Sequence, residues 1–122
     1  MIGYMTFGTA DLQRAAIFYD LLLAELGAKR IMELERGIAW GTAPDAPGFG
    51  VMWPFDGKPA VAGNGFMVSF RAPDRAAVDR VHARALELGG TCEGAPGPRG
   101  PGLYIAYFRD LDGNKLATFV VG

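Results

Sequence analysis

Hydrophobic and polar positions follow the same order in the two halves of the chain. Residues 2–7 alternate as a short strand does, and a helical pattern of apolar positions follows and ends at Gly27. Residues 66–70 alternate again, and a second helical pattern ends at Gly89. An Asp that can cap a helix precedes each pattern. The apolar helical positions are Leu12, Ala15, Ala16, Tyr19, Leu22, Leu23 and Leu26, then Val78, Val81, Ala85 and Leu88.

Three runs of strand character follow each predicted helix. They cover residues 29–34, 38–41 and 50–55 in the first half, and 91–93, 103–109 and 115–121 in the second. AELG before the first stop and LELG before the second lie 62 residues apart, which is the period of a duplicated supersecondary unit. We therefore predict an α+β fold in a single domain, 1–122, built from two tandem βαβββ modules at about 1–57 and 64–122. The Gly- and Pro-rich residues 54–65 link the modules.

One helix per module covers one face of the sheet, so the helices are expected outside and the other faces around a cleft. Residues 95–102, APGPRGPG, predict an irregular loop. The DLDGN sequence lacks the closing Glu of a calcium loop and predicts a hairpin turn closed by Asp110 and Asn114. His82 lies on the second helix and is expected to face away from the cleft.

Composition restricts the possible partners. The chain has 122 residues, half of them apolar, and a formal charge of −1, which suits a compact soluble domain. No stripe of Lys and Arg predicts binding to nucleic acid, and no apolar run reaches the roughly 20 residues of a membrane span. No signal peptide is visible, and Cys92 is the only cysteine, without a His or Asp beside it in sequence. These features predict a cytoplasmic protein with a structural thiol.

A family resemblance follows from three of these features. The duplicated βαβββ order, the stretch FDGKPAVAGNGFMVSFRAPDRAAVDRVHARALELGG and the ending YIAYFRDLDGNKL resemble the vicinal oxygen chelate superfamily, also called glyoxalase/bleomycin resistance protein/dioxygenase. The resemblance covers essentially the whole chain. It implies two modules whose concave sheets form a cupped mixed sheet, often with a divalent metal at the bottom. It also implies a homodimer, for which edge strands and the apolar first helix are candidate contacts.

The residues at the family's metal positions depart from the family pattern. Family members take a His from the first strand of each module and a Glu from the last strand of the second. The matching positions here hold Tyr4, Met67 and Ala117. A phenol and a thioether are poor ligands for such ions, and Ala offers none. We therefore expect neither a metal nor another cofactor.

Strand alternation predicts which residues line the cleft. Tyr4 and Thr6 share a face of the first strand, and Met67 and Ser69 share a face of the matching strand. The closing hairpin puts Tyr107 opposite Ala117, and Ile105 opposite Phe119. The orientations of Trp40 and Trp53 stay open. The predicted ligand-binding residues are thus Tyr4, Thr6, Met67, Ser69, Ile105, Tyr107, Ala117 and Phe119.

Two function classes remain. The first is a metal-independent protein that holds an apolar or aromatic small molecule by stacking. The second is an enzyme, a glyoxalase-like lyase, a dioxygenase-like oxidoreductase or a metal-free variant with Tyr4 or Tyr107 as proton donor. A phenol has an ordinary pKa of about 10, and the sequence places no Lys, Arg or His near either tyrosine, so the enzyme stays second. Packing of the lining as core or dimer interface is a further alternative, against which the small or polar Thr6, Ser69 and Ala117 argue.

Overall fold

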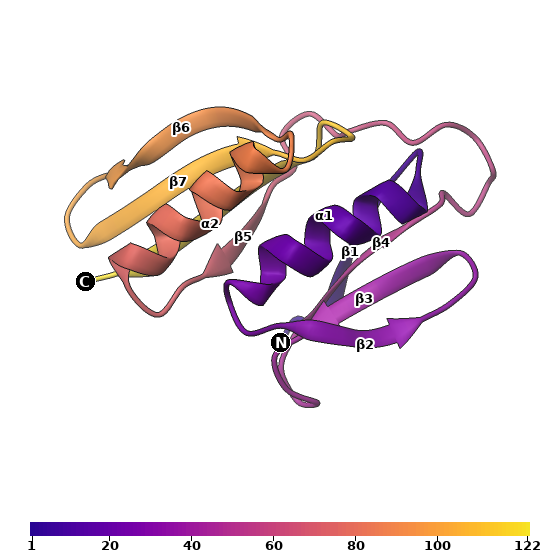
Figure 1. Ribbon diagram of the computed structural model, residues 1–122, viewed down its shortest axis with the longest axis horizontal. Coiled ribbons are helices and arrows are strands. Elements are labelled where there is room, and N and C mark those ends of the chain that lie inside the picture. The colour runs from indigo at the N-terminus through magenta and orange to yellow at the C-terminus, as the bar shows by residue number, and fades with distance from the viewer. The chain divides into compact units, whose positions relative to one another are not determined.

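The computed structural model describes residues 1–122, which divide into two compact units, residues 1–62 (unit 1) and 63–122 (unit 2). Each unit has the element order βαβββ, and in each a helix lies across one face of a four-stranded sheet (Figure 1). The predicted duplicated α+β fold is therefore confirmed, with two separate mixed sheets.

Unit 1 consists of β1 (Tyr4–Gly8), α1 (Leu12–Ala24), β2 (Lys29–Glu33), β3 (Gly37–Gly41) and β4 (Gly48–Met52). Its strands lie in the order β1-β4-β3-β2, with β1 parallel to β4 and the other pairs antiparallel. An aromatic cluster fills the space between sheet and helix: the ring of Tyr19 from α1 lies 4.9 Å from Phe49 and 5.6 Å from Trp40. Burial of such large rings contributes strongly to the stability of this unit.

Unit 2 consists of β5 (Val68–Arg71), α2 (Arg75–Glu87), β6 (Thr91–Pro98), β7 (Leu103–Arg109) and β8 (Lys115–Val121). The strand order is β5-β8-β7-β6, with β5 parallel to β8. Helix α2 packs against β6, β7 and β8. The buried residues of this interface include Val78, Val81, Ala85, Phe108 and Leu116.

The predicted caps and turns are present. The Oδ1 atom of Asp11 accepts a hydrogen bond from the Arg14 amide at 3.0 Å, and that of Asp74 accepts one from the Ala77 amide at 2.8 Å. Asp110 closes the last hairpin, since its carboxylate accepts hydrogen bonds from both the backbone and the side-chain amide of Asn114. This closure sets the register of β7 against β8.

The predicted loop at residues 95–102 is wrong in its first half. Residues up to Pro98 continue β6, and Pro98 pairs with Tyr104 of β7. Prolines are tolerated here because β6 is the edge strand of its sheet, where a missing N–H disrupts no ladder. The register also shifts around Gly94 and Gly97, which lets the irregular sequence follow its partner.

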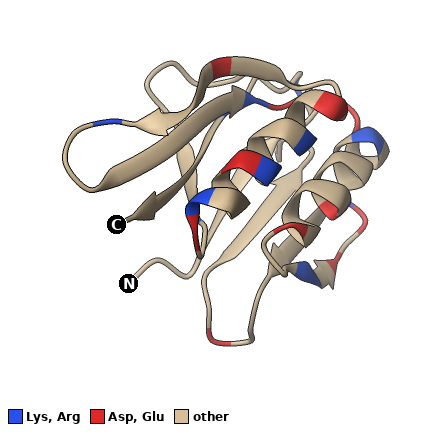
Figure 2. Cartoon of the chain, turned by 60° about the vertical axis from the view of Figure 1, so that its left-hand side comes forward, with Lys and Arg blue, Asp and Glu red and all other residues tan.

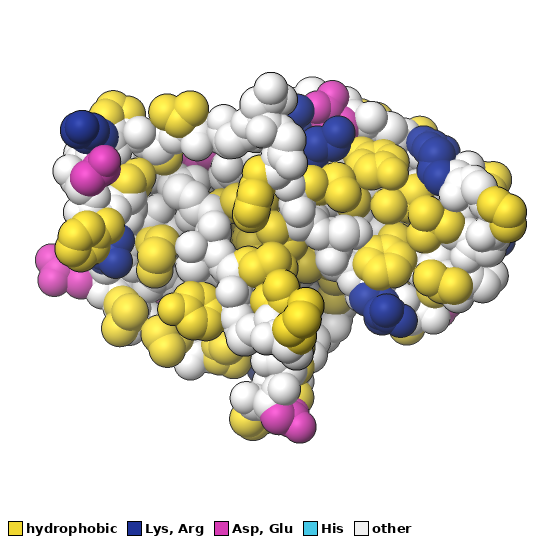
Figure 3. Space-filling model, turned by 180° about the vertical axis from the view of Figure 1, so that it is seen from behind, with side chains coloured by type: hydrophobic (Ala, Val, Ile, Leu, Met, Phe, Trp, Pro, Cys, Tyr) yellow, Lys and Arg dark blue, Asp and Glu magenta, His cyan; other side chains and the backbone are white.

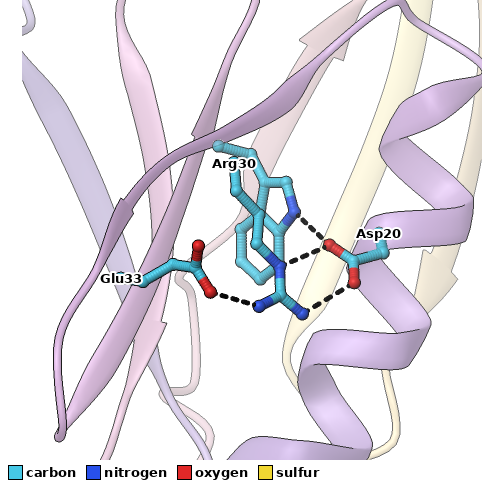
Figure 4. Close-up of polar contacts among 4 residues, drawn as sticks. Asp20, Arg30 and Glu33 are labelled. Carbon is cyan, nitrogen blue, oxygen red and sulfur yellow. Dashed lines mark hydrogen bonds and ion pairs between the residues drawn. The ribbon is translucent and has the colours of Figure 1, made fainter.

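Trp40, whose orientation the sequence left open, faces α1. It is 1% exposed, and its Nε1 donates to Asp20 Oδ1 at 2.9 Å. Arg30 lies between Asp20 and Glu33 and donates to both carboxylates (Figure 4). The hydrogen bonds from Arg30, followed by that from Trp40, hold the pKa of Asp20 below its usual value despite partial burial. Trp40 therefore belongs to the core and to the attachment of α1, and it is not a candidate to line a site.

Charged side chains of both signs are distributed along α2 (Figure 2). The helix reads Arg75, Asp79, Arg80, Arg84 and Glu87 on its polar positions. Neither helix has the length and apolar character needed to cross a lipid bilayer.

Candidate functional site

By strand alternation, the predicted lining residues of the strands lie on the sheet faces opposite α1 and α2, but Ala117 and Ile105 are buried there, at 0% and 6% exposure. On β1, Phe7 is buried on the helix side, and Tyr4 and Thr6 alternate with it on the other side. Tyr4 is 75% exposed and pairs with Gly48, and Thr6 pairs with Gly50. Met67 lies one residue before β5 and is exposed.

Unit 1 carries a groove beside the end of β4. It has a volume of about 570 Å³, and Thr6 lines it together with Met52, Trp53, Phe55 and residues 58–61. Trp53, the other tryptophan whose orientation the sequence does not predict, lines this groove and is 45% exposed. The guanidinium of Arg36 lies 5.3 Å from the Phe55 ring centroid, and its Nη1 donates to the Trp53 carbonyl at 2.8 Å. The groove thus offers an indole and a hydroxyl, whereas Tyr4 is not part of its lining.

In unit 2, five of the predicted residues form two rows across the sheet, together with Arg71, which pairs with one of them. Ser69 on β5 is opposite Ala117 on β8, which is opposite Tyr107 on β7. Arg71 is opposite Phe119, which is opposite Ile105. The two β7–β8 pairings are those expected from the hairpin, and together they place an exposed hydroxyl, a phenol and an aromatic ring on one face.

Tyr107 occupies space that a glycine leaves free. It is opposite Gly94 on β6, where an added Cβ would lie 2.9 Å from the Tyr107 Cδ2 atom. Contacts that close essentially never occur, so the ring lies where it does because position 94 has no side chain. The Tyr107 hydroxyl has no hydrogen bond within the chain, since the side chain contacts other polar groups only through the face of its ring.

Two cations lie over the Tyr107 ring. The Lys115 Nζ is 5.4 Å from its centroid, and the Arg99 guanidinium is 5.9 Å from it. The expectation that no Lys, Arg or His lies near this tyrosine is therefore wrong. Arg99 lies in the turn between β6 and β7, and strand pairing alone does not predict the position of a side chain in a turn. The alternation that placed Ala117 on this face also places Lys115 there, and this signal was available in the sequence.

A third cation extends the same face. The Arg71 guanidinium lies 5.5 Å from the Phe119 ring centroid. Arg109 is neutralised by an ion pair with Glu93, but Arg71, Arg99 and Lys115 have no carboxylate within ion-pair distance. Figure 3 shows this side of unit 2 on its right, where dark blue side chains border an apolar area. We call the surface formed by Arg71, Arg99, Tyr107, Lys115 and Phe119 the cation–aromatic face.

The residues present do not fit the divalent metal that is frequent in the family the sequence resembles. Tyr4, Met67 and Ala117 supply a phenol, a thioether and a methyl group at the three matching positions. No group of three or more His, Cys, Asp or Glu side chains comes together elsewhere in residues 1–122.

His82 does not contribute to either face. It is buried on α2, its ring packs edge-on against Phe108, and its Nε2 lies 3.3 Å from the Cys92 Sγ. Burial lowers the pKa of His82, while Asp79 opposes this effect. Cys92 thus has a histidine neighbour that its sequence surroundings did not indicate, because α2 and β6 bring the two residues together only in the fold.

Comparison with known proteins gives a consistent picture. The family model described as Glyoxalase/Bleomycin resistance protein/Dioxygenase superfamily matches residues 1–118. A glyoxalase/bleomycin resistance protein from Albidiferax ferrireducens T118 has a similar structure, with a TM-score of 0.93 and 36% identity over 100% of this chain and 99% of its own. The fosfomycin resistance protein FosX from Mesorhizobium loti has a TM-score of 0.72 at 20% identity, over 100% and 92% of the two chains. Lactoylglutathione lyase from Agrobacterium tumefaciens has a TM-score of 0.70 at 22% identity, over 98% and 92%. No curated protein matches the sequence.

Proposed function

The chain belongs to the glyoxalase/bleomycin resistance protein/dioxygenase superfamily, and within it we propose a metal-independent protein that binds a small molecule with an apolar or aromatic body. The observation that carries the proposal is the chemistry at the three family metal positions, which hold Tyr4, Met67 and Ala117. Without ligands of a suitable kind, binding relies on stacking and on hydrogen bonds.

Two surfaces support this proposal. In unit 1 the groove combines the indole of Trp53 with the hydroxyl of Thr6. In unit 2 the row Ser69, Ala117, Tyr107 combines two hydroxyl groups with a small residue between them. Aromatic walls with few polar groups are typical of small-molecule sites. The ligand-binding roles of the individual residues stay predictions.

A titration of metal-stripped protein tests the proposal. Thermal shift and native mass spectrometry are recorded first with divalent metals and then with a panel of aromatic and antibiotic-like compounds. We expect no stabilisation by metals and stabilisation by at least one aromatic compound, because bound ligand stabilises the folded state by mass action. Stabilisation by a metal at micromolar concentration would overturn the proposal and restore glyoxalase-like or dioxygenase-like chemistry.

The second candidate is an enzyme that uses Tyr107 as proton donor. The observation that favours it is the hydroxyl of Tyr107, which has no hydrogen-bond partner in the chain and lies on the same row as Ser69. A Tyr107→Phe variant separates the candidates. Loss of turnover with retained binding supports the enzyme, whereas retained binding without any turnover in the wild type supports the binding protein.

We also propose a homodimer. Two exposed apolar surfaces are candidates for the contact with a second copy: Ile17 and Leu21 on α1, and Ile31 and Met32 on the edge strand β2, on the sheet face away from α1. Sedimentation of the wild type and of Ile17→Lys tests this proposal. A wild-type monomer at all concentrations would contradict it.

A further inference from the structure

We infer that the ligand of the cation–aromatic face is a small organic anion, an aromatic body that carries a carboxylate or phosphate group. This inference rests on the proposed function and specifies its ligand class. Every charged side chain at the positions of β5, β7 and β8 that face this side is basic, namely Arg71, Arg109 and Lys115.

The charges on this face are not balanced locally. Arg109 pairs with Glu93 from the edge strand, so three positive charges remain, those of Arg71, Arg99 and Lys115. The whole chain has a formal charge of −1, so this face is positively charged although the net charge of the protein is negative. Such a local positive potential attracts anions and repels divalent cations.

The aromatic rings place the cations where a ligand would meet them. Arg99 and Lys115 are held over Tyr107, and Arg71 is held over Phe119, each within 6 Å of a ring centroid. Arg99 is ordered further, because its Nη2 donates to the Ala95 carbonyl at 3.2 Å and Gly94 and Gly97 leave room beside it. Side chains that are already ordered lose less conformational entropy when they bind an anion.

The row between these cations supplies the remaining contacts. Ser69 and Tyr107 offer hydroxyl donors on either side of Ala117, and the half-buried Phe119 offers apolar surface in the next row, where Ile105 is only 6% exposed. An aromatic ring over this apolar surface brings an attached anionic group within reach of the cations. The face therefore combines the contacts that an aryl anion requires, namely charge-assisted hydrogen bonds and apolar burial.

Matched probes test the anion requirement. Calorimetric titration compares 1-naphthoate and 1-naphthyl phosphate with the neutral 1-naphthamide, at low and at physiological ionic strength. We expect the anions to bind about tenfold or more tightly than the amide, with a difference that shrinks as salt increases. The variants Arg99→Gln and Lys115→Gln are expected to weaken naphthoate by about 5- to 20-fold and to leave naphthamide unchanged.

Arg80→Gln is the matched control, because Arg80 lies on α2, which covers the opposite face of the same sheet. It removes the same charge and is expected to leave naphthoate binding unchanged. Lys115→Arg, which keeps the charge, is expected to restore binding. Melting curves by circular dichroism confirm that each variant is folded, as expected for exposed or half-buried side chains.

The outcomes separate this inference from the proposed function. Equal binding of acid and amide, or equal loss in Arg80→Gln, overturns the anion requirement and leaves small-molecule binding in place. Binding of a single-stranded oligonucleotide more tightly than naphthoate also overturns it, because the partner is then a polymer. Metal binding without binding of any naphthyl probe overturns the proposed function itself, and failure of every probe at millimolar concentration counts against both.

Discussion

Thr118 provides a sharp test of how unit 2 is stabilised. Its side chain lies on the helix side of β8, opposite Phe70 and Ala106, and is 0% exposed. The hydroxyl Oγ1 has no hydrogen-bond partner. A buried hydroxyl without a partner costs about 1–3 kcal/mol relative to one that is solvated. The change Thr118→Val replaces this hydroxyl with a methyl group and keeps the branched side chain that strands favour.

We expect Thr118→Val to stabilise the protein by about 1–3 kcal/mol, through removal of the unpaired hydroxyl and burial of a further methyl group. Urea denaturation followed by far-ultraviolet circular dichroism measures this change. The slope of the unfolding free energy against urea concentration should stay the same, because the variant exposes the same surface when it unfolds. Thermal scans should show a rise of about 3–5 °C for each kcal/mol.

Two further variants at the same position separate the contributions. Thr118→Ser keeps the hydroxyl and removes the methyl group, so it should lose about 1 kcal/mol. Thr118→Ala removes both and should lie between Ser and Val. A Val variant less stable than the wild type would refute the reasoning, because it would show that Oγ1 has a partner such as a buried water molecule.

Three further predictions concern other parts of the fold. Asp20→Asn should lower the free energy of unfolding by about 1–2 kcal/mol in urea titrations, because it removes the negative charge from the bidentate contact with Arg30. An unchanged free energy of unfolding would show that this contact contributes nothing to stability. Because burial lowers the pKa of His82, the unfolded chain binds more protons there, so stability should fall as the pH decreases from about 6.5 through the lower folded-state pKa. Thermal scans across that range should show a weaker dependence in His82→Gln, and equal slopes would contradict the argument. Gly94→Ala should displace the Tyr107 ring and weaken aryl binding in calorimetry, whereas Gly3→Ala in unit 1, whose added Cβ meets no atom within 4 Å, is the control that should leave aryl binding unchanged.

Most of the secondary structure was predictable because its signals are local. The bounds of β7 and β8 match the expected runs 103–109 and 115–121, since strong alternation meets a hairpin turn with an Asp and an Asn at its ends. The opposition of Tyr107 and Ala117 follows from the same turn. The extension of β6 through Pro98 was not predictable from composition, because it depends on β6 being an edge strand.

The candidate site was less predictable for a similar reason. Ser69, Ala117 and Tyr107 could be placed on one face by alternation, but the surroundings of the phenol assemble across four strands and a turn. Arg99 reaches the ring from the β6–β7 turn, whose geometry depends on the irregular register near Gly94. Contacts of this kind depend on tertiary structure, so the positions of the two residues along the sequence do not predict them.

The uneven distribution of a few residue types between the units gives each unit its own spectroscopic probe. Both tryptophans, Trp40 and Trp53, belong to unit 1, and the single cysteine, Cys92, belongs to unit 2. Indole emission therefore reports on unit 1, from one core position and one groove position, while a label on the thiol reports on unit 2. Two melting curves recorded on one sample would show whether the duplicated halves unfold in one transition or in two.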